Sequence, residues 1–165
     1  RMRINLGCGG DIRKGYLNID VRPLGPSVLQ LDLEKQLLVP FPDGCAEEIL
    51  AKDVIEHISW RRVDDLLRDC FRVLKPEGVL LIQVPDMEAI ARKVILNPGF
   101  QYGELKGWRA ISFWVYGAQD YPENLHKSGF TIQTLRELLE SIGFRVEEIR
   151  NNGGTNIVCR AVRVK

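Results

Sequence analysis

The sequence predicts a single α/β domain with a mostly parallel seven-stranded sheet, an antiparallel C-terminal strand and a missing or shortened first helix. Three observations lead to this prediction. An apolar run at residues 3–6 enters a glycine turn, and a second run ends in Asp20 only eleven positions after Gly9, which leaves too little chain for a helix and a strand. The nearly continuous apolar run 79–84 is typical of a parallel strand covered on both faces. The last two runs are joined by the tight turn 151–154, as in antiparallel pairs.

The remaining elements follow from hydrophobic periodicity and turn residues. Between residues 61 and 74 the apolar positions have helical spacing, with Ser59 as the expected N-cap and Pro76 as the stop. Asp86 and Thr131 are the expected N-caps of two further helices, and Gly143 ends the second. The strands are expected at residues 3–6, 17–20, 27–31, 47–51, 79–84, 144–150 and 155–164.

Length and charge limit the classes of partner. A chain of 165 residues is long enough for one domain, residues 1–165, with its own core. Its 23 basic and 22 acidic residues give no electrostatic footprint for a nucleic-acid backbone. No apolar run approaches the roughly 20 residues of a membrane span, and no signal peptide is visible. We therefore expect a cytoplasmic protein with neither nucleic acid nor a membrane as partner.

The cysteines and histidines show no sequence pattern for a metal site. The four cysteines contain no Cys-x-x-Cys pair, and the two histidines lie far apart in the sequence. We expect reduced thiols and no bound metal. Cys8 lies inside the glycine turn, where it is either a nucleophile or a small residue that a tight turn tolerates, and we favour the second alternative.

The glycine turn and two aspartates form a pattern typical of nucleoside binding. Gly7 and Gly9 would allow a ligand to approach the backbone closely. Asp20, at the tip of the second strand, can accept hydrogen bonds from two ribose hydroxyls, and Asp32 follows the third strand. Taken singly, each aspartate is better explained as a turn residue that ends its strand, but in this order after the glycine turn we favour cofactor binding.

Several motifs in order resemble the class I S-adenosylmethionine-dependent methyltransferases, and most closely their type-11 group, which has a Rossmann-like fold. The short connection from the glycine turn to Asp20, residues 9–20, also resembles a branch of this family that is associated with glycan and polysaccharide biosynthesis. The matching pieces are Leu6-Gly7-Cys8-Gly9, Asp20, Asp32, residues 40–43, 54–57 and 72–78, and Gly129-Phe130 before a helix that ends in Gly143-Phe144.

The resemblance implies that S-adenosylmethionine is the cofactor. The residues it assigns to cofactor binding are Leu6, Gly7, Cys8, Gly9, Asp20, Val21, Asp32, Leu33, Lys52 and Asp53. Two departures matter. The first is the shortened first helix, which leaves the backbone N–H groups of the turn to do more. The second is Lys52-Asp53, where similar sequences often have a neutral polar residue or histidine. The chain also lacks the N-terminal helices that many relatives place over the cofactor. Without them the site is either open or covered by another subunit.

Three residues are the candidates for catalysis. Asp53, just beyond the fourth strand, could stabilise the sulfonium, hold the methionine ammonium or remove an acceptor proton, or it could simply cap the next segment. His57 is expected to be structural or part of the site wall rather than catalytic. His126, in a polar loop before a family-like segment, is our first choice as general base.

Residues 97–130 are unusually aromatic. A planar apolar wall with amide and charged groups suits a sugar ring or an aromatic acceptor, so the segment is a candidate acceptor wall or lid. The alternative is a hydrophobic cover over the sheet edge, or the interface of a homodimer. The segment holds eight of the 13 aromatic residues: Phe100, Tyr102, Trp108, Phe113, Trp114, Tyr116, Tyr121 and Phe130.

The leading functional hypothesis is methyl transfer from S-adenosylmethionine to an oxygen (or nitrogen) of a small-molecule or saccharide acceptor. A non-catalytic cofactor-binding or regulatory domain of the same fold is the alternative. A nicotinamide-dependent oxidoreductase is disfavoured by the short connection after the glycines and by the antiparallel last strand, and fold alone does not choose among these functions.

Overall fold

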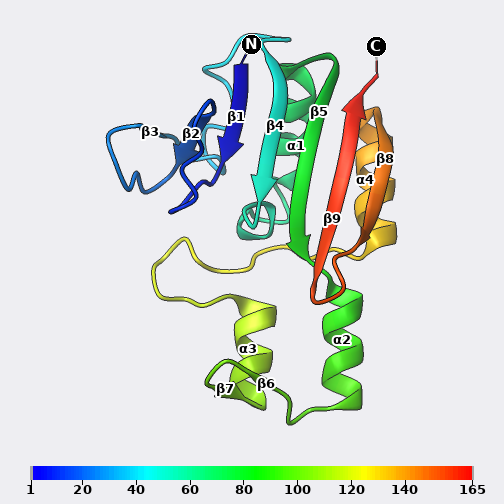
Figure 1. Cartoon of the computed structure of the whole chain (residues 1–165). Helices are drawn as coiled ribbons and strands as arrows, with labels where there is room; N and C mark the ends of the chain where they lie inside the picture. Colours follow the sequence, from blue (N-terminus) through cyan, green and yellow to red (C-terminus); the bar gives the residue numbers. More distant parts are fainter. Residues whose placement is uncertain (1, 165) are drawn as a thin grey trace.

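The structure, a computed structural model, describes residues 2–164 and contains one seven-stranded sheet of order β3-β2-β1-β4-β5-β9-β8. All neighbouring pairs are parallel except those of β9, which is antiparallel to both β5 and β8. The predicted fold class is confirmed (Figure 1). The strands are β1 (Met2–Leu6), β2 (Leu17–Asp20), β3 (Val28–Gln30), β4 (Ala46–Lys52), β5 (Leu74–Pro85), β8 (Phe144–Asn151) and β9 (Asn156–Arg163).

The first helix is missing, as predicted. The connection from β1 to β2 is a series of turns held by two buried amide side chains. Asn5 Nδ2 donates to the Asp11 carbonyl at 2.8 Å and to Asn18 Oδ1 at 3.0 Å, and Asn18 Oδ1 also accepts from the Arg13 N–H at 2.9 Å. These amides satisfy backbone groups that an intervening helix would have satisfied internally.

Helix α1 (Val63–Val73) buries one amphipathic face, but both of its ends differ from prediction. Its N-cap is Arg62, and Ser59 lies in the preceding turn, where its carbonyl accepts from the Arg62 and Val63 N–H groups. The helix stops before Pro76 is reached, because Leu74 already pairs with Ala46 as the first residue of β5. Residues 75–78 form an irregularity inside that strand, where the pairing register shifts and Glu77 has a φ of 62°.

Helix α4 (Ile132–Ile142) follows the sequence signals closely. Thr131 and Thr134 form a capping box, and Gly143 ends the helix in the left-handed conformation. Leu135 and Leu139 face the sheet and are fully buried. With α1, this helix builds the main hydrophobic core against the sheet.

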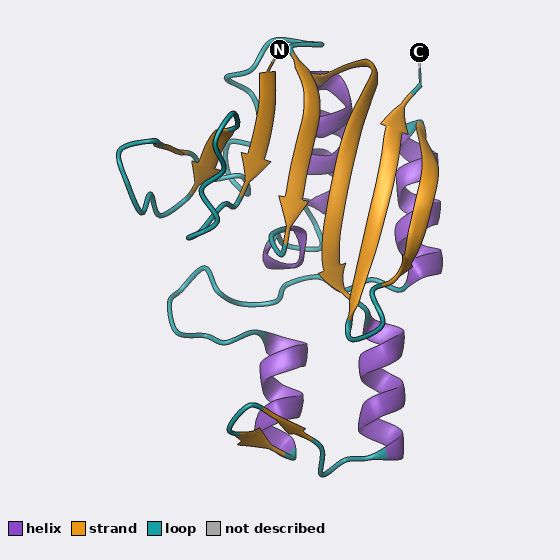
Figure 2. Cartoon of the chain, viewed as in Figure 1, coloured by secondary structure: helices purple, strands orange, loops and turns teal. Residues whose placement is uncertain are grey.

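The sheet is covered on one face only, which corrects the expectation of a strand buried on both faces. Figure 2 shows α1 and α4 on the same side of the sheet, and no helix among residues 2–164 lies over the other side. In β5, Leu80, Ile82 and Val84 are buried against the helices, whereas Leu81 and Gln83 between them remain partly exposed. We call this side, which carries Leu50, Lys52, Leu81, Gln83, Val158 and Arg160, the open face.

A smaller unit lies beyond the carboxyl ends of the central strands (Figure 1). It consists of α2 (Met87–Leu96), the two-stranded ribbon of β6 (Gln101–Tyr102) and β7 (Leu105–Lys106), and α3 (Trp108–Tyr116). Asp86 caps α2, as predicted. The smaller unit has a hydrophobic cluster of its own, formed by Ile90, Phe100, Ala110 and Trp114. None of the helices in the described chain has the length and apolar character needed to cross a membrane.

Candidate active site

The glycine turn is fixed by steric and hydrogen-bonding constraints. Gly7 and Gly9 have φ values of 56° and 48°, in the left-handed region that favours glycine. A Cβ on Gly7 would lie 2.3 Å from Val54 Cγ2, whereas one on Gly9 would have no neighbour within 4 Å. The Gly9 N–H donates to Asp20 Oδ2 at 2.8 Å, which ties the turn to the end of β2.

A cavity of about 350 Å³, here called the larger cavity, lies at the carboxyl ends of the parallel strands. This is the edge where open α/β sheets bind ligands, at the point where the strand order reverses between β1 and β4. Six residues that the sequence predicted to bind a cofactor line it: Gly7, Asp20, Val21, Asp32, Leu33 and Asp53.

The two aspartates of the predicted nucleoside pattern are both held by backbone donors. Asp20 Oδ1 accepts from the Arg22 N–H at 2.8 Å, so each of its oxygens receives one backbone bond and retains a lone pair. Asp32 Oδ1 accepts from the Glu34 and Lys35 N–H groups, and Oδ2 pairs with Lys35 Nζ at 2.9 Å. Burial pushes the pKa of Asp32 up, but these hydrogen bonds and the Lys35 charge outweigh it and lower the pKa. Asp32 thus caps its own turn while also facing the cavity.

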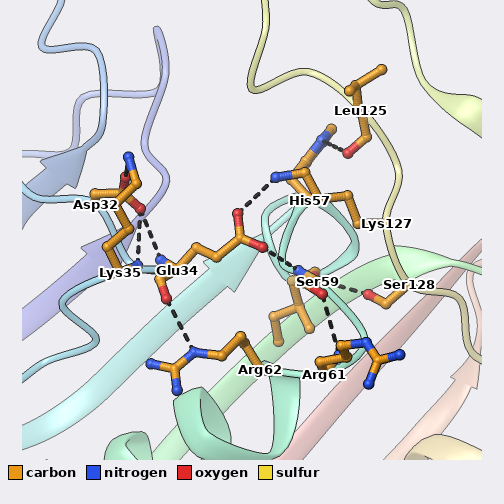
Figure 3. A network of polar contacts seen from close by, with 11 residues as sticks. Asp32, Glu34, Lys35, His57, Ser59, Arg61, Arg62, Leu125, Lys127 and Ser128 are labelled. Carbon is orange, nitrogen blue, oxygen red and sulfur yellow. Dashed lines mark hydrogen bonds and ion pairs between the residues drawn. The ribbon is translucent and has the colours of Figure 1, made fainter.

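A rim of the larger cavity lies within the predicted wall or lid segment 97–130 and is formed by Tyr121, Pro122, Glu123 and Lys127, although the sequence did not indicate the contacts that hold it. Lys127 Nζ pairs with Glu34 Oε2 at 2.7 Å, and Glu34 Oε1 accepts from the Ser59 N–H at 2.9 Å (Figure 3). The Arg22 guanidinium lies 4.0 Å from the centre of the Tyr121 ring. These contacts hold the rim against β2 and the segment after β3, although Glu34 and Lys127 are 93 residues apart.

A second cavity of about 240 Å³, here called the smaller cavity, lies beside the first. Asp53 and His57 line both cavities. Tyr102, Phe113 and Trp114, from the predicted aromatic segment, line the smaller one. Trp114 also stacks on Phe100, with ring centres 4.6 Å apart, inside the core of the smaller unit. The segment therefore provides a cavity wall and a hydrophobic core at once.

Asp53 occupies a strained position at the boundary of the two cavities. Its φ of 53° lies in the left-handed region, which costs a non-glycine residue about 1–3 kcal/mol and is typical of functional sites. Gln83 Nε2 donates to both carboxylate oxygens at 3.0 and 3.1 Å, and the Asp53 N–H donates to the Gln83 carbonyl at 2.9 Å. The carboxylate is thus held rather than free to rotate.

The two histidines, distant in sequence, meet in space. Their ring centres are 5.0 Å apart, His57 Nδ1 lies 3.0 Å from the Leu125 carbonyl, and His126 Nδ1 lies 3.0 Å from the Trp114 carbonyl. Because a carbonyl only accepts, each Nδ1 carries the hydrogen and each Nε2 presents a lone pair. Burial lowers the pKa of both rings, and for His57 the charge of His126 lowers it further.

Glu56 completes this group. The residue is 2% exposed, and burial, reinforced by the charge of Asp53, raises the pKa of its carboxyl to about 8. Its main-chain carbonyl accepts from the Lys127 and Ser128 N–H groups, which fixes the segment carrying His126 against the 3₁₀ helix η1 (Ile55–His57). From the sequence, Glu56 stands out only as part of the motif at residues 54–57, because burial of a charged residue has no local signal.

Comparison with known proteins assigns the family. Residues 5–82 match the family model described as a methyltransferase domain. The chain is 30% identical over 111 residues to a probable S-adenosylmethionine-dependent methyltransferase of Mycolicibacterium smegmatis, an alignment that covers 67% of this chain and 33% of that protein. The matched domain and this relative support a class I S-adenosylmethionine-dependent methyltransferase of type 11. The chain spans about a third of the length of that relative.

Solved methyltransferases share the fold. The S-adenosylmethionine-dependent methyltransferase of Archaeoglobus fulgidus has a TM-score of 0.65 and 16% identity, over 98% of this chain and 86% of that one. The 1,6-didemethyltoxoflavin-N1-methyltransferase of Burkholderia thailandensis, solved with bound 1,6-didemethyltoxoflavin and S-adenosylhomocysteine, has a TM-score of 0.64 and 14% identity, over 99% and 71%. At such identities the likeness shows the shared architecture.

Four residues assigned to cofactor binding by the methyltransferase resemblance lie outside the larger cavity. Leu6 and Cys8 are buried in or beneath the glycine turn, and Gly9 contributes its N–H to Asp20. Lys52, the last residue of β4, lines a hollow on the open face, whereas Asp53, just beyond the strand, lines the larger cavity. A role of these four residues in cofactor binding stays a prediction.

Proposed function

We propose that this protein transfers a methyl group from S-adenosylmethionine to an oxygen or nitrogen of a small-molecule or saccharide acceptor. The observation that carries the proposal is that Asp53 and His57 border both cavities. A donor in the larger cavity and an acceptor in the smaller one would meet at this boundary.

The residues of the larger cavity suit the cofactor. Asp20 offers two oxygens that each keep a lone pair, as two neighbouring ribose hydroxyls require. Leu31, Leu33 and Ile58 supply apolar wall for a purine. The carboxylates of Asp20, Asp32 and Asp53 suit a ligand with positive charge and several hydrogen-bond donors.

S-adenosylmethionine, when bound, supplies a methyl group already activated by its sulfonium. The residues of this chain then hold the two reactants in line, and such positioning lowers the barrier by about 7–11 kcal/mol. Asp53 places negative charge at the boundary, and His126 presents its Nε2 lone pair to accept the acceptor's proton. Tyr102 and Phe113 offer flat surfaces to a sugar or aromatic ring.

Calorimetric titration of the protein with S-adenosylmethionine, S-adenosylhomocysteine and NAD tests the cofactor assignment. Asp20→Ala removes two acceptors, and at about 1.5–3 kcal/mol for hydrogen bonds to a charged group it should raise the Kd by roughly 10- to 160-fold. Asp64→Ala is the matched control, because it makes the same charge change on an exposed face of α1. Equal binding by wild type and Asp20→Ala contradicts the assignment, and binding of NAD alone contradicts the proposed function.

Methyl transfer itself is measured with labelled donor and a panel of monosaccharides, nucleotide sugars and small phenols and amines. His126→Ala should lower kcat by about 10²–10⁴ without changing cofactor affinity, because His126 lines only the smaller cavity. A fully active His126→Ala protein contradicts the role of base. Cofactor binding without transfer to any acceptor class supports the non-catalytic alternative.

A further inference from the structure

Glu56, His57 and His126 form a cluster that the methyltransferase assignment does not explain. One ligand atom from each of the three lies within 4.8 Å of those of the other two, and His57 Nε2 lies 3.9 Å from Glu56 Oε1. All three line the smaller cavity. The sequence predicts no metal site because the two histidines lie far apart along the chain, but the fold brings His57 and His126 together.

The hydrogen bonds around the histidines are those of metal ligands. In most metal sites the nitrogen that does not bind the ion donates its hydrogen to a carbonyl or carboxylate, which fixes the tautomer and the ring orientation. Here Nδ1 of His57 donates to the Leu125 carbonyl and Nδ1 of His126 to the Trp114 carbonyl, both at 3.0 Å. The two Nε2 lone pairs are therefore left for a ligand, on rings whose orientation is set in advance.

One oxygen of the cluster's carboxylate has no hydrogen-bond partner among the described residues. Glu56 is 2% exposed, and this oxygen, Oε2, is buried. Leaving a buried polar atom unpaired is costly, and for a charged one the cost is larger. Lys127, whose charge acts on His57, is engaged by Glu34 at 2.7 Å, while Asp53 adds further negative charge nearby. A bound cation would pair with Glu56 and with that charge together.

We propose that Glu56, His57 Nε2 and His126 Nε2 bind one divalent transition-metal ion of the Zn²⁺ type, with an open coordination position toward the smaller cavity. Two imidazoles and one carboxylate are a common three-ligand set for such ions when a fourth position is left for water or substrate. Ligand distances of about 2.0–2.2 Å require the three atoms to approach one another by roughly an ångström, which side-chain rotation supplies.

This proposal stands independently of methyl transfer. The ion and a proton from the acceptor would use the same lone pair of His126, so the metal-bound enzyme would not use that residue as a base. Binding of the ion is measurable without cofactor or acceptor, so its failure leaves the proposed function intact.

The test is titration of the untagged protein, first dialysed against EDTA, with Zn²⁺ by calorimetry and with Co²⁺ by visible absorption. We expect one ion per chain and Co²⁺ ligand-field bands without a thiolate charge-transfer band. Glu56→Gln, which keeps the side-chain shape, and His126→Ala should each weaken binding by more than about tenfold, the lower limit for losing even a supporting residue.

Glu123→Gln is the matched control, because Glu123 also has a buried unpartnered oxygen but lines only the larger cavity. It should bind the ion as wild type does. Absence of binding by wild type, a thiolate band, or binding that survives both Glu56→Gln and His126→Ala overturns the proposal. Circular dichroism identifies a variant that has failed to fold. If His126→Ala fails to fold, the binding affinity of Glu56→Gln and the Co²⁺ spectrum of the wild type decide whether the metal site exists.

Discussion

Replacing Gly7 by alanine tests whether the glycine turn depends on the close approach of Val54. The new Cβ would lie 2.3 Å from Val54 Cγ2 and 2.7 Å from Val54 Cβ, in a residue with φ of 56°. The left-handed conformation costs alanine about 1–2 kcal/mol, and forcing a methyl group into packed surroundings costs about 1–3 kcal/mol more. Gly7→Ala should therefore lower the free energy of unfolding by about 2–5 kcal/mol.

Gly9→Ala is the control for the conformational part alone. Gly9 has a similar φ of 48°, but its added Cβ would meet nothing within 4 Å. This variant should lose only about 1–2 kcal/mol. In the double variant Gly7→Ala/Val54→Ala, removal of the valine methyl groups abolishes the 2.3 Å contact with Cγ2 but leaves the 2.7 Å contact with Cβ. The collision is therefore relieved in part, and the two substitutions should be less destabilising together than the sum of their separate effects.

Urea unfolding followed by tryptophan fluorescence gives the free energies, and titration with S-adenosylhomocysteine gives the accompanying loss of affinity at the larger cavity. Should Gly7→Ala prove no more destabilising than Gly9→Ala, the contact with Val54 would not be what requires glycine at this position. Strict additivity in the double variant would lead to the same conclusion.

Two further predictions separate wall from core and test the glycine turn's cysteine. Trp114→Ala should lower the free energy of unfolding by about 3–5 kcal/mol, because Trp114 is 8% exposed and stacked on Phe100. Tyr102→Ala, at a half-exposed residue of the same cavity, should instead raise the acceptor KM with little change in Tm. The reverse pattern in thermal melts and kinetics would exclude the assignment of Trp114 to the core and of Tyr102 to the acceptor wall. Burial, and to a smaller extent the charge of Asp20, raises the pKa of the Cys8 thiol, so less Cys8 thiolate is present at pH 8 than at an unperturbed cysteine. Iodoacetamide should therefore label the more exposed Cys45 before Cys8. Peptide mass spectrometry measures the order, and faster labelling of Cys8 would restore it as a candidate nucleophile.

The missing first helix and the antiparallel last pair were predictable because their signals are local. The interval between Gly9 and Asp20 is too short for a helix, and the turn 151–154 makes the last pair antiparallel. The cover of the sheet was not predictable, because Leu81 on the open face and Leu80 in the core look the same in a sequence. An apolar strand indicates where burial is favourable and does not indicate whether a helix is present to provide it.

The candidate site, like the fold, was predictable from the sequence only in part. Gly7, Asp20 and Asp32 end consecutive strands, so their meeting at one sheet edge follows from the fold class. The pairing of Lys127 with Glu34 and of His57 with His126 depends on the path of residues 117–128, which no periodicity encodes. The N-cap of α1 was not predictable either: it is Arg62 rather than Ser59, because a serine near a helix start can belong to the preceding turn equally well.

The open face gives the two sides of one sheet different responses to mutation and to ionic strength. Toward α1 and α4, alternate strand residues are packed apolar groups whose truncation leaves a cavity. On the opposite surface, pairs such as Arg160 with Glu147 and Arg150 with Glu148 lie in water, where salt screens them over about 10 Å. Along β5 and β9, every second position should therefore tolerate substitution, and the positions between should not.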